Sequence, residues 1–208
     1  MTAVVDQALW TFDDFCERIP EGLKADLIEG VIYVASPDHI EHYGINSWLH
    51  TVLNLIILRR KLKGRLFGFK IAFRLNVRNG PEPDLAYVSP LNLHRVRKTY
   101  IDRPPNAAFE IVSPDSVERD YRKKRKQYQR AGVEEYWIID PLVRRVRCYH
   151  LADDGKYRPV RPRNGRIDSQ IIPGFWLKPS WLWQSSLPNA LETVEEILSV
   201  TNANGKSN

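Results

Sequence analysis

Two short apolar runs on either side of a charged helical pattern constrain the fold more than any other feature of the sequence. Residues 107–112 and 136–139 are typical of buried strands, because neither run shows the alternation of a strand with one wet face. Between them, residues 117–131 follow helical spacing, and Gly132 is suited to capping the helix. In such a strand–helix–strand unit the two strands are parallel and the crossover is right-handed. The sequence therefore predicts an α/β domain around a central sheet.

The segments around this unit add antiparallel hairpins and two more helices. A capping box at Thr11 predicts a helix that runs to Arg18, and Glu29-Gly30 predicts the turn of a hairpin. Apolar residues at helical spacing predict a long helix from about residue 45 to 61. Further strands are expected over residues 66–73, 72–77, 85–88, 143–151 and 156–172. The fold class is therefore α/β with a mixed α+β character.

The length of 208 residues suits one domain, which we expect over residues 1–185, followed by a helical segment and polar tail over 186–208. No stretch approaches the roughly 18 apolar residues that span a membrane. No secretory signal is evident at the N-terminus. The two cysteines, Cys16 and Cys148, lie far apart in the sequence, which favours a reducing, cytoplasmic location.

The formal net charge of +6 is concentrated in a few segments. The densest lies in the helix of residues 117–131, where Arg122, Lys123 and Lys126 are expected to face outward and to bind a nucleic-acid backbone. Charge alone is about equally consistent with a solvated face on an ordinary basic protein, since it describes non-specific attraction. The charge therefore does not identify a reaction, which has to be inferred from the candidate catalytic residues.

One acid lies at the start of a buried run and a second lies inside another. Asp84 directly precedes the strand of residues 85–88, and Glu110 lies between Phe109 and Ile111. A buried carboxylate is costly without a partner or a metal. Carboxylate oxygens are the ligands that Mg²⁺ prefers, and a bound metal can activate water against a phosphodiester. Alone, Asp84 would more often be a turn residue, whereas an isolated buried acid such as Glu110 usually belongs to a site or an ion pair.

A lysine lies on the apolar side of the basic helix. One side of that helix carries Val117, Tyr121, Lys124, Tyr128 and Ala131, at steps of four and three residues. An inward ammonium has to find a carboxylate, and the crossover folds this helix back over the strand of Glu110. We therefore predict that Lys124 lies within about 8 Å of the Glu110 carboxylate and is the active-site lysine. The alternative is a purely structural buried pair.

Several motifs together resemble the Uma-two family, bacterial proteins described as restriction endonucleases within the PD-(D/E)XK nuclease superfamily. They are Pro83-Asp84, the run 110–114, the spacing Asp120–Lys124–Tyr128, and the run 131–141, which is the most specific. Upstream, the segment 26–30 resembles the early hairpin of the family, and His42 resembles its histidine before the long helix. The resemblance covers roughly residues 9 to 180.

The resemblance implies a restriction-endonuclease-like central mixed sheet flanked by helices, with Mg²⁺ (or Mn²⁺) bound by Asp84, Glu110 and the Ile111 carbonyl. The superfamily pattern places a lysine at the position of Val112, and in the family that lysine is relocated to the helix, here Lys124. Asp26 stands where the family has glutamate and, on its own, is as consistent with a hairpin residue as with a catalytic one. His39 and His42 have ligand-like spacing, but no further ligands follow at zinc-site spacing, so both are expected to be loop or helix-start residues.

The leading hypothesis is a Mg²⁺-dependent endonuclease that hydrolyses DNA and acts as a homodimer. The apolar positions of the C-terminal segment are candidates for packing on a partner: Leu191, Val194, Ile197 and Leu198. Two alternatives stay open. One is a catalytically inactive nucleic-acid-binding module on a nuclease fold, and the other is a phosphodiesterase directed at RNA or nucleotides.

Overall fold

The computed structural model describes residues 9–20, 22–37, 39–68 and 70–204. Its α-helices are α1 (Phe12–Arg18), α2 (Ile40–Arg59), α3 (Arg125–Ala131) and α4 (Ala190–Asn204). Two 3₁₀ segments, η1 (Pro90–Arg95) and η3 (Pro179–Trp183), and the π-helical turn η2 (Arg119–Lys124) complete the helical elements. Within these residues, no helix is both long enough and apolar enough to cross a membrane.

The core of the molecule is a six-stranded mixed sheet with the strand order β10-β9-β8-β7-β5-β3. Its strands are β3 (Arg65–Gly68), β5 (Leu85–Val88), β7 (Ala107–Ile111), β8 (Glu135–Asp140), β9 (Arg145–Leu151) and β10 (Tyr157–Pro159). The central strands β7 and β8 are parallel, and every other neighbouring pair in this sheet is antiparallel. The predicted strand–helix–strand unit and the mixed sheet are thus confirmed.

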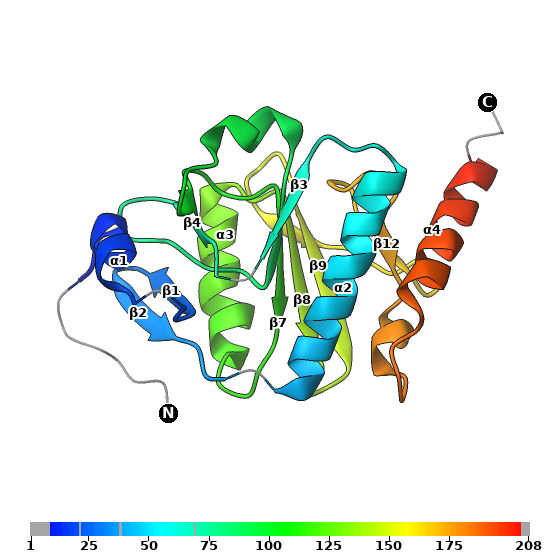
Figure 1. The fold of residues 1–208 in the computed structure, drawn as a ribbon, viewed down its shortest axis with the longest axis horizontal. Helices are drawn as coiled ribbons and strands as arrows, with labels where there is room; N and C mark the ends of the chain where they lie inside the picture. The colour runs from blue at the N-terminus through cyan, green and yellow to red at the C-terminus, as the bar shows by residue number, and fades with distance from the viewer. Residues whose placement is uncertain (1–8, 21, 38, 69, 205–208) are drawn as a thin grey trace.

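Helices cover both faces of this sheet (Figure 1). On one face, Phe109, Trp137 and Ile139 pack in a core that includes the apolar side of α2. On the other face, Ala108 and Ile138 pack in a second core that contains Tyr128 of α3. Successive residues of a strand point to opposite faces, so strands that are apolar at every position must be covered on both sides.

The C-terminal helix α4 packs beside α2 in the same core. Val194 and Ile197 are 2% and 0% exposed, because they pack against residues of their own chain. The expectation that they form a free surface for a partner is therefore wrong, although Leu191 is 63% exposed.

A small hairpin and α1 lie at the edge of the domain, beside α3 (Figure 1). The hairpin consists of β1 (Ala25–Ile28) and β2 (Val31–Val34), and the predicted capping box of α1 is present at Thr11. The hairpin is tied to α3 by Gln127, whose amide nitrogen donates to the carbonyl of Leu27 at 3.0 Å. This contact fixes the hairpin over the helix end that carries the basic residues.

The segment 66–77 departs from the prediction of continuous strands. After β3 ends, Lys70 takes a positive φ of 69°, which interrupts an extended chain. The chain resumes only as β4 (Ala72–Phe73), which pairs in parallel with β6 (Tyr100–Ile101) outside the main sheet. The alternating apolar residues up to Val77 therefore do not form a continuous strand. Asn76 and Asn79 pair with each other and close a turn there. Two further short strands, β11 (Ile167–Asp168) and β12 (Trp176–Leu177), form a separate ribbon.

Candidate active site

The two predicted metal-binding acids lie side by side at the end of β5 and within β7. The antiparallel register pairs Leu85 with Phe109, and one further step along it sets Asp84 opposite Glu110. Both side chains therefore point to the face of the sheet that α3 covers. Asp84 Oδ2 accepts a hydrogen bond from the backbone N–H of Ile111 at 2.7 Å. Two acids and the backbone of a third residue thus meet at one point.

Lys124 lies between two acids on this face. Its Nζ is 2.9 Å from Glu110 Oε2 and 2.9 Å from Asp26 Oδ2, and its side chain is 2% exposed. The other Glu110 oxygen, Oε1, accepts a hydrogen bond from the Tyr128 hydroxyl at 2.7 Å. The predicted proximity of Lys124 to Glu110 is confirmed, whereas its role in catalysis stays a prediction.

The helix that carries Lys124 starts differently from the prediction. Val117 is 40% exposed and does not face the sheet, and Asp120 at 2% exposed takes the inward position instead. The cause is local: the first turn is the π-helical η2, and the Ser116 hydroxyl bonds to the Asp120 carboxylate. A π-turn holds an extra residue, which rotates everything before it relative to the helix that follows. π-turns occur often at functional sites.

The hairpin brings two more charged side chains to the same place. Asp26 Oδ1 accepts from the backbone N–H of Glu82 at 2.9 Å, and Asp26 Oδ2 faces Lys124 and, at 3.4 Å, Arg119 Nε. The ammonium of Lys24 forms an ion pair with Asp84 Oδ1. Asp26, a predicted catalytic residue for which a hairpin position was the alternative, lies in this cluster, whereas Lys24 was not predicted. A signal existed, because Lys24 and Asp26 are two positions apart and an extended chain sends both to one face.

The two histidines at the start of α2 differ in their surroundings. His39 is exposed at the N-cap of the helix, and its side chain makes no capping hydrogen bond. His42, in the first turn of α2, is 5% exposed, and its Nε2 lies 3.4 Å from Asp84 Oδ2. The expectation that His42 is an ordinary helix-start residue is therefore too modest, since it contacts the central acid of the site.

Negative charge is in excess in this buried cluster. It contains five carboxyl groups and three permanently charged cations: Asp26, Glu82, Asp84, Glu110 and Asp120, with Lys24, Arg119 and Lys124. Burial raises the pKa of Glu110 to about 8, against the opposing charge of Lys124. Burial likewise raises the pKa of Glu82 to about 7 and that of Asp120 to about 6.

Asp84 behaves in the opposite way. Burial alone would raise the pKa of its carboxyl, but Lys24 and His42 outweigh that effect and hold the pKa well below its usual range. For Lys124, burial would lower the pKa, and the charges of Asp26 and Glu110 hold it above its usual range. The site therefore holds an ionised Asp84 beside three acids with raised pKa values, Glu82, Glu110 and Asp120, whose ionisation is resisted until more positive charge arrives.

These residues fit a divalent cation. The excess of carboxylates is what a hard cation neutralises, and the Asp120 Oδ1 atom is buried without a hydrogen bond from any described residue. On the donor side, Arg119 is 8% exposed, and its Nε and Nη1 likewise form no hydrogen bond within the described chain. The cavity among these side chains measures about 30 Å³, which is room for an ion or waters and too little for a nucleotide.

A wider groove lies between the hairpin and the basic helix, and Arg122, Lys123 and Lys126 all line it. Its volume is about 420 Å³, and Tyr33 forms part of the opposite wall. Lys123 Nζ donates to the Tyr33 hydroxyl at 2.7 Å and lies 4.6 Å from the centre of its ring. The structure thus brings the three predicted nucleic-acid-binding residues to one groove. They lie within two positions of Lys124 in the sequence.

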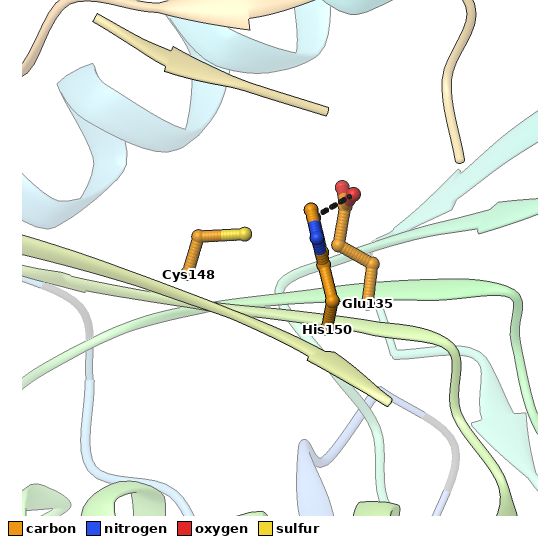
Figure 2. Close-up of side chains that lie close together, drawn as sticks. All are labelled: Glu135, Cys148 and His150. Atoms are coloured by element: carbon orange, nitrogen blue, oxygen red, sulfur yellow. Dashed lines mark ion pairs between the residues drawn. The ribbon is translucent and has the colours of Figure 1, made fainter. Parts of the chain in front are cut away.

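A second cluster of potential metal ligands lies on the opposite face of the sheet, where Glu135, Cys148 and His150 come within 4.8 Å of one another (Figure 2). The Glu135 oxygens already accept from Trp137 Nε1 at 2.6 Å and from the backbone of Gln170 at 2.7 Å, and His150 Nε2 lies 2.9 Å away. Burial raises the pKa of the Cys148 thiol far above its usual range, and metals bind the thiolate. We interpret this cluster as a structural anchor of β8 and β9.

The fold and the acid cluster define the class of protein as restriction-endonuclease-like. The model of the Uma2 family, described as "Putative restriction endonuclease", matches residues 11–180, and the chain belongs to this family. The match includes the hairpin, His42, both acids and Lys124. The sequence resemblance to the Uma-two family is thereby confirmed.

A solved structure has the same fold. It is described as a "putative nuclease belonging to DUF820" from Anabaena variabilis ATCC 29413. The TM-score is 0.67 at 19% sequence identity, and the similarity covers 83% of this chain and 97% of that one. Curated proteins provide no match. The predicted mixed sheet flanked by helices, with its antiparallel hairpins, is therefore confirmed.

Proposed function

We propose that this protein is a Mg²⁺-dependent endonuclease that hydrolyses phosphodiester bonds of DNA. The observation that carries the proposal is the convergence of Asp84, Glu110 and Lys124 on one buried point beside a basic groove. Membership of a family described as restriction endonucleases supports nuclease chemistry in general. The metal, the substrate and the residue roles are inferred from the site.

Asp84 and Glu110 would hold the cation, with the Ile111 carbonyl as a third ligand. In an antiparallel pairing a residue directs its N–H and its C=O to the same side of the strand. Because the Ile111 N–H bonds Asp84, its carbonyl is expected on the Asp84 side as well. Mn²⁺ has the same preference for carboxylate and carbonyl oxygens and is a plausible substitute. When bound, the metal would polarise the phosphate and lower the pKa of a water molecule.

The cationic side chains have separate tasks in this mechanism. Lys124 would stabilise the charge that develops on the phosphate, and Asp26 would hold Lys124 in position from the side opposite Glu110. The Arg119 nitrogens Nε and Nη1, which form no hydrogen bond within the described chain, would donate to a phosphate oxygen. Arg122, Lys123 and Lys126 would bind the flanking backbone in the groove.

The direct test is cleavage of supercoiled plasmid DNA with Mg²⁺, with Mn²⁺ and with EDTA. We expect nicked and linear products with either metal and none with EDTA. A parallel panel of single-stranded DNA, RNA and cyclic or linear dinucleotides separates DNA from the other phosphodiester substrates. Salt-dependent binding of DNA without turnover on any substrate would instead indicate an inactive binding module.

A homodimer remains part of the proposal, because a symmetric pair of sites suits a duplex with two antiparallel strands. The burial of Val194 and Ile197 removes α4 as the obvious contact surface. Light scattering at micromolar concentration, with and without a duplex, tests this point. A monomer under both conditions would exclude the dimer.

A further inference from the structure

Both oxygens of the Asp84 carboxylate are already engaged by protein groups. Oδ2 accepts from the Ile111 N–H at 2.7 Å and faces His42 Nε2 at 3.4 Å. Oδ1 is held by the ammonium of Lys24. The Asp84 side chain is only 3% exposed, so water from bulk solvent has little access to either oxygen.

A cation shared between Asp84 and Glu110 therefore meets a competitor. Mg²⁺ binds carboxylate oxygens at about 2.0–2.1 Å and tolerates little distortion of its octahedral shell. An oxygen that accepts a close hydrogen bond from an ammonium cannot also accept a small divalent ion along the same direction, and the two positive charges repel each other. Because Oδ2 is fixed by the backbone of β7, Oδ1 is the oxygen that has to become available.

The two lysines of the site differ in how easily they can move. The Lys124 side chain is 2% exposed and lies between three acids on a helix that is packed against the sheet. Lys24 is 23% exposed and precedes the first residue of β1, at the rim of the cavity. A lysine on a flexible four-carbon stem at a rim can turn its ammonium into water once another cation compensates the charge of Asp84. Lys124 has no such path.

We propose that Lys24 is an internal competitor for the metal position. Its ammonium holds the Asp84 carboxylate in the metal-free protein and has to leave Asp84 Oδ1 before a divalent ion can bind Asp84 and Glu110 together. This inference rests on the proposed function, because it assumes that these acids bind the ion. Lys24 is then a positioning residue that keeps a buried carboxylate ionised and placed until the metal replaces it.

The first experiment uses the wild-type chain and avoids any loss of folding. Reductive methylation of lysines is followed by mass spectrometry, in EDTA and in saturating Ca²⁺ or Mg²⁺ without DNA. We expect Lys24 to be methylated several-fold faster with the metal, because the displaced ammonium points into solvent. Exposed Lys63 provides the control within the same molecule and should not change. An unchanged rate at Lys24, in a protein shown to bind the metal, overturns the inference.

The second experiment measures binding of Mg²⁺ and Mn²⁺ alone by titration calorimetry. Lys24→Met and Lys24→Gln remove the competing charge, and we expect them to bind about tenfold more tightly, equivalent to about 1.4 kcal/mol. Lys24→Arg keeps a cation at this position and Lys63→Met alters a distant one, so both should match the wild type. Equal binding by the Met and Gln variants would mean that Lys24 does not compete with the metal, and weaker binding would mean that it supports the site; either result overturns the inference.

The outcomes separate this inference from the proposed function. If the wild type binds metal and Asp84→Asn does not, the metal site stands, and the Lys24 variants alone decide the role of Lys24. If neither the wild type nor the Lys24 variants bind any divalent ion, the metal-dependent function fails, and the inference about Lys24 fails with it.

Discussion

The Lys124 ammonium lies 2.9 Å from Glu110 Oε2, although the two residues belong to a helix and to the strand before it. The contact follows from the crossover, which lays the helix back over the face of β7 on which Glu110 points. Asp26 from the hairpin reaches the same ammonium from the other side. The strand and the helix follow each other in the sequence, whereas the hairpin lies about eighty residues upstream, and all three elements contribute a charged side chain to this contact.

Lys124→Met is expected to lower cleavage by at least about a hundredfold, because it removes a fixed charge at the reacting phosphate. DNA binding should stay within a few-fold of the wild type, since Lys124 is 2% exposed and its outward neighbours are unchanged. Plasmid cleavage and fluorescence anisotropy with a labelled duplex measure the two effects, and circular dichroism checks the fold.

Lys123→Met and Lys126→Met are the matched controls for Lys124→Met, because both residues lie on the same helix and line the groove. They should retain turnover at saturating DNA and lose affinity. If either of them is the inactivating change while Lys124→Met still cleaves, the assignment of the active-site lysine is wrong.

The metal-free protein is expected to lose stability as the pH rises from about 5 to about 8. The folded-state pKa values of Glu110, Glu82 and Asp120 are raised to about 8, 7 and 6, above those of the unfolded chain. The folded state therefore holds protons that the unfolded state has released, and stability falls as pH rises through this window. Asp84 has a lowered pKa, so its contribution is complete above about pH 4 and does not alter the trend.

Thermal unfolding in EDTA at pH 5, 6, 7 and 8 measures this dependence. Glu110→Gln cannot ionise and should flatten the upper part of the curve, whereas substitution of the exposed Asp153 by Asn should leave it unchanged. Saturating Mg²⁺ should reverse the trend in the wild type, because the cation favours the ionised acids. A wild-type curve that rises steadily from pH 5 to 8 in EDTA would contradict the charge balance described here.

Tyr128→Phe isolates the hydrogen bond that positions Glu110. The hydroxyl donates to Glu110 Oε1 at 2.7 Å inside the core, and its removal leaves one oxygen of a buried carboxylate unsatisfied. We expect a loss of about 1–3 kcal/mol in the free energy of unfolding, the usual cost of leaving a buried acceptor without its hydrogen bond. Urea denaturation measures this loss. Tyr33→Phe is the control, since Tyr33 lies at the groove and outside the buried cores.

Strand parity and crossover handedness predict the pairing of Glu110 with Lys124, because both depend on regular geometry that local sequence encodes. The inward turn of Asp120 and Arg119 was not predictable in the same way. It depends on a π-turn whose extra residue shifts the helical period, and on a hydrogen bond between Ser116 and Asp120 that forms only when the chain is folded. Helical spacing alone placed Val117 in the position that Asp120 takes.

The position of His42 illustrates a different limit of sequence reasoning. Its contact with Asp84 joins residues 42 positions apart and depends on how α2 packs on the sheet. The periodicity of the sequence carries no information about such a long-range contact. Family resemblance marked the residue without giving its partner. The spacing of Lys24 and Asp26 indicated that both side chains point to one face of the hairpin. That Asp84 is the partner of Lys24 could not be predicted, because it depends on how the hairpin packs against the sheet.

Glu135→Ala tests the interpretation of the second cluster as structural. The buried carboxylate, with 0% side-chain exposure, accepts from Trp137, Ser169 and Gln170 and pairs with His150. Its removal leaves these donors without an acceptor, and we expect a loss of about 3–5 kcal/mol in the free energy of unfolding. Metal content by mass spectrometry should show no ion that disappears with Glu135 or with Cys148→Ser. Asp153→Ala, an exposed change, should be within about 0.5 kcal/mol of the wild type.

The groove between the hairpin and the basic helix is expected to bind the DNA backbone through charge. Arg122 and Lys126 are exposed, lie one turn apart on the helix and line the groove together. If each contacts one phosphate, the double variant Arg122→Gln with Lys126→Gln should reduce the slope of log K against log salt by about 1.8, or about 0.9 for each contact. Anisotropy titrations between low and moderate salt measure the slope. A double change of exposed lysines away from the groove, Lys63→Gln with Lys98→Gln, should leave it unaltered. Weaker binding at every salt concentration with no change in slope would mean that the two residues act on the fold of the helix and do not contact phosphates.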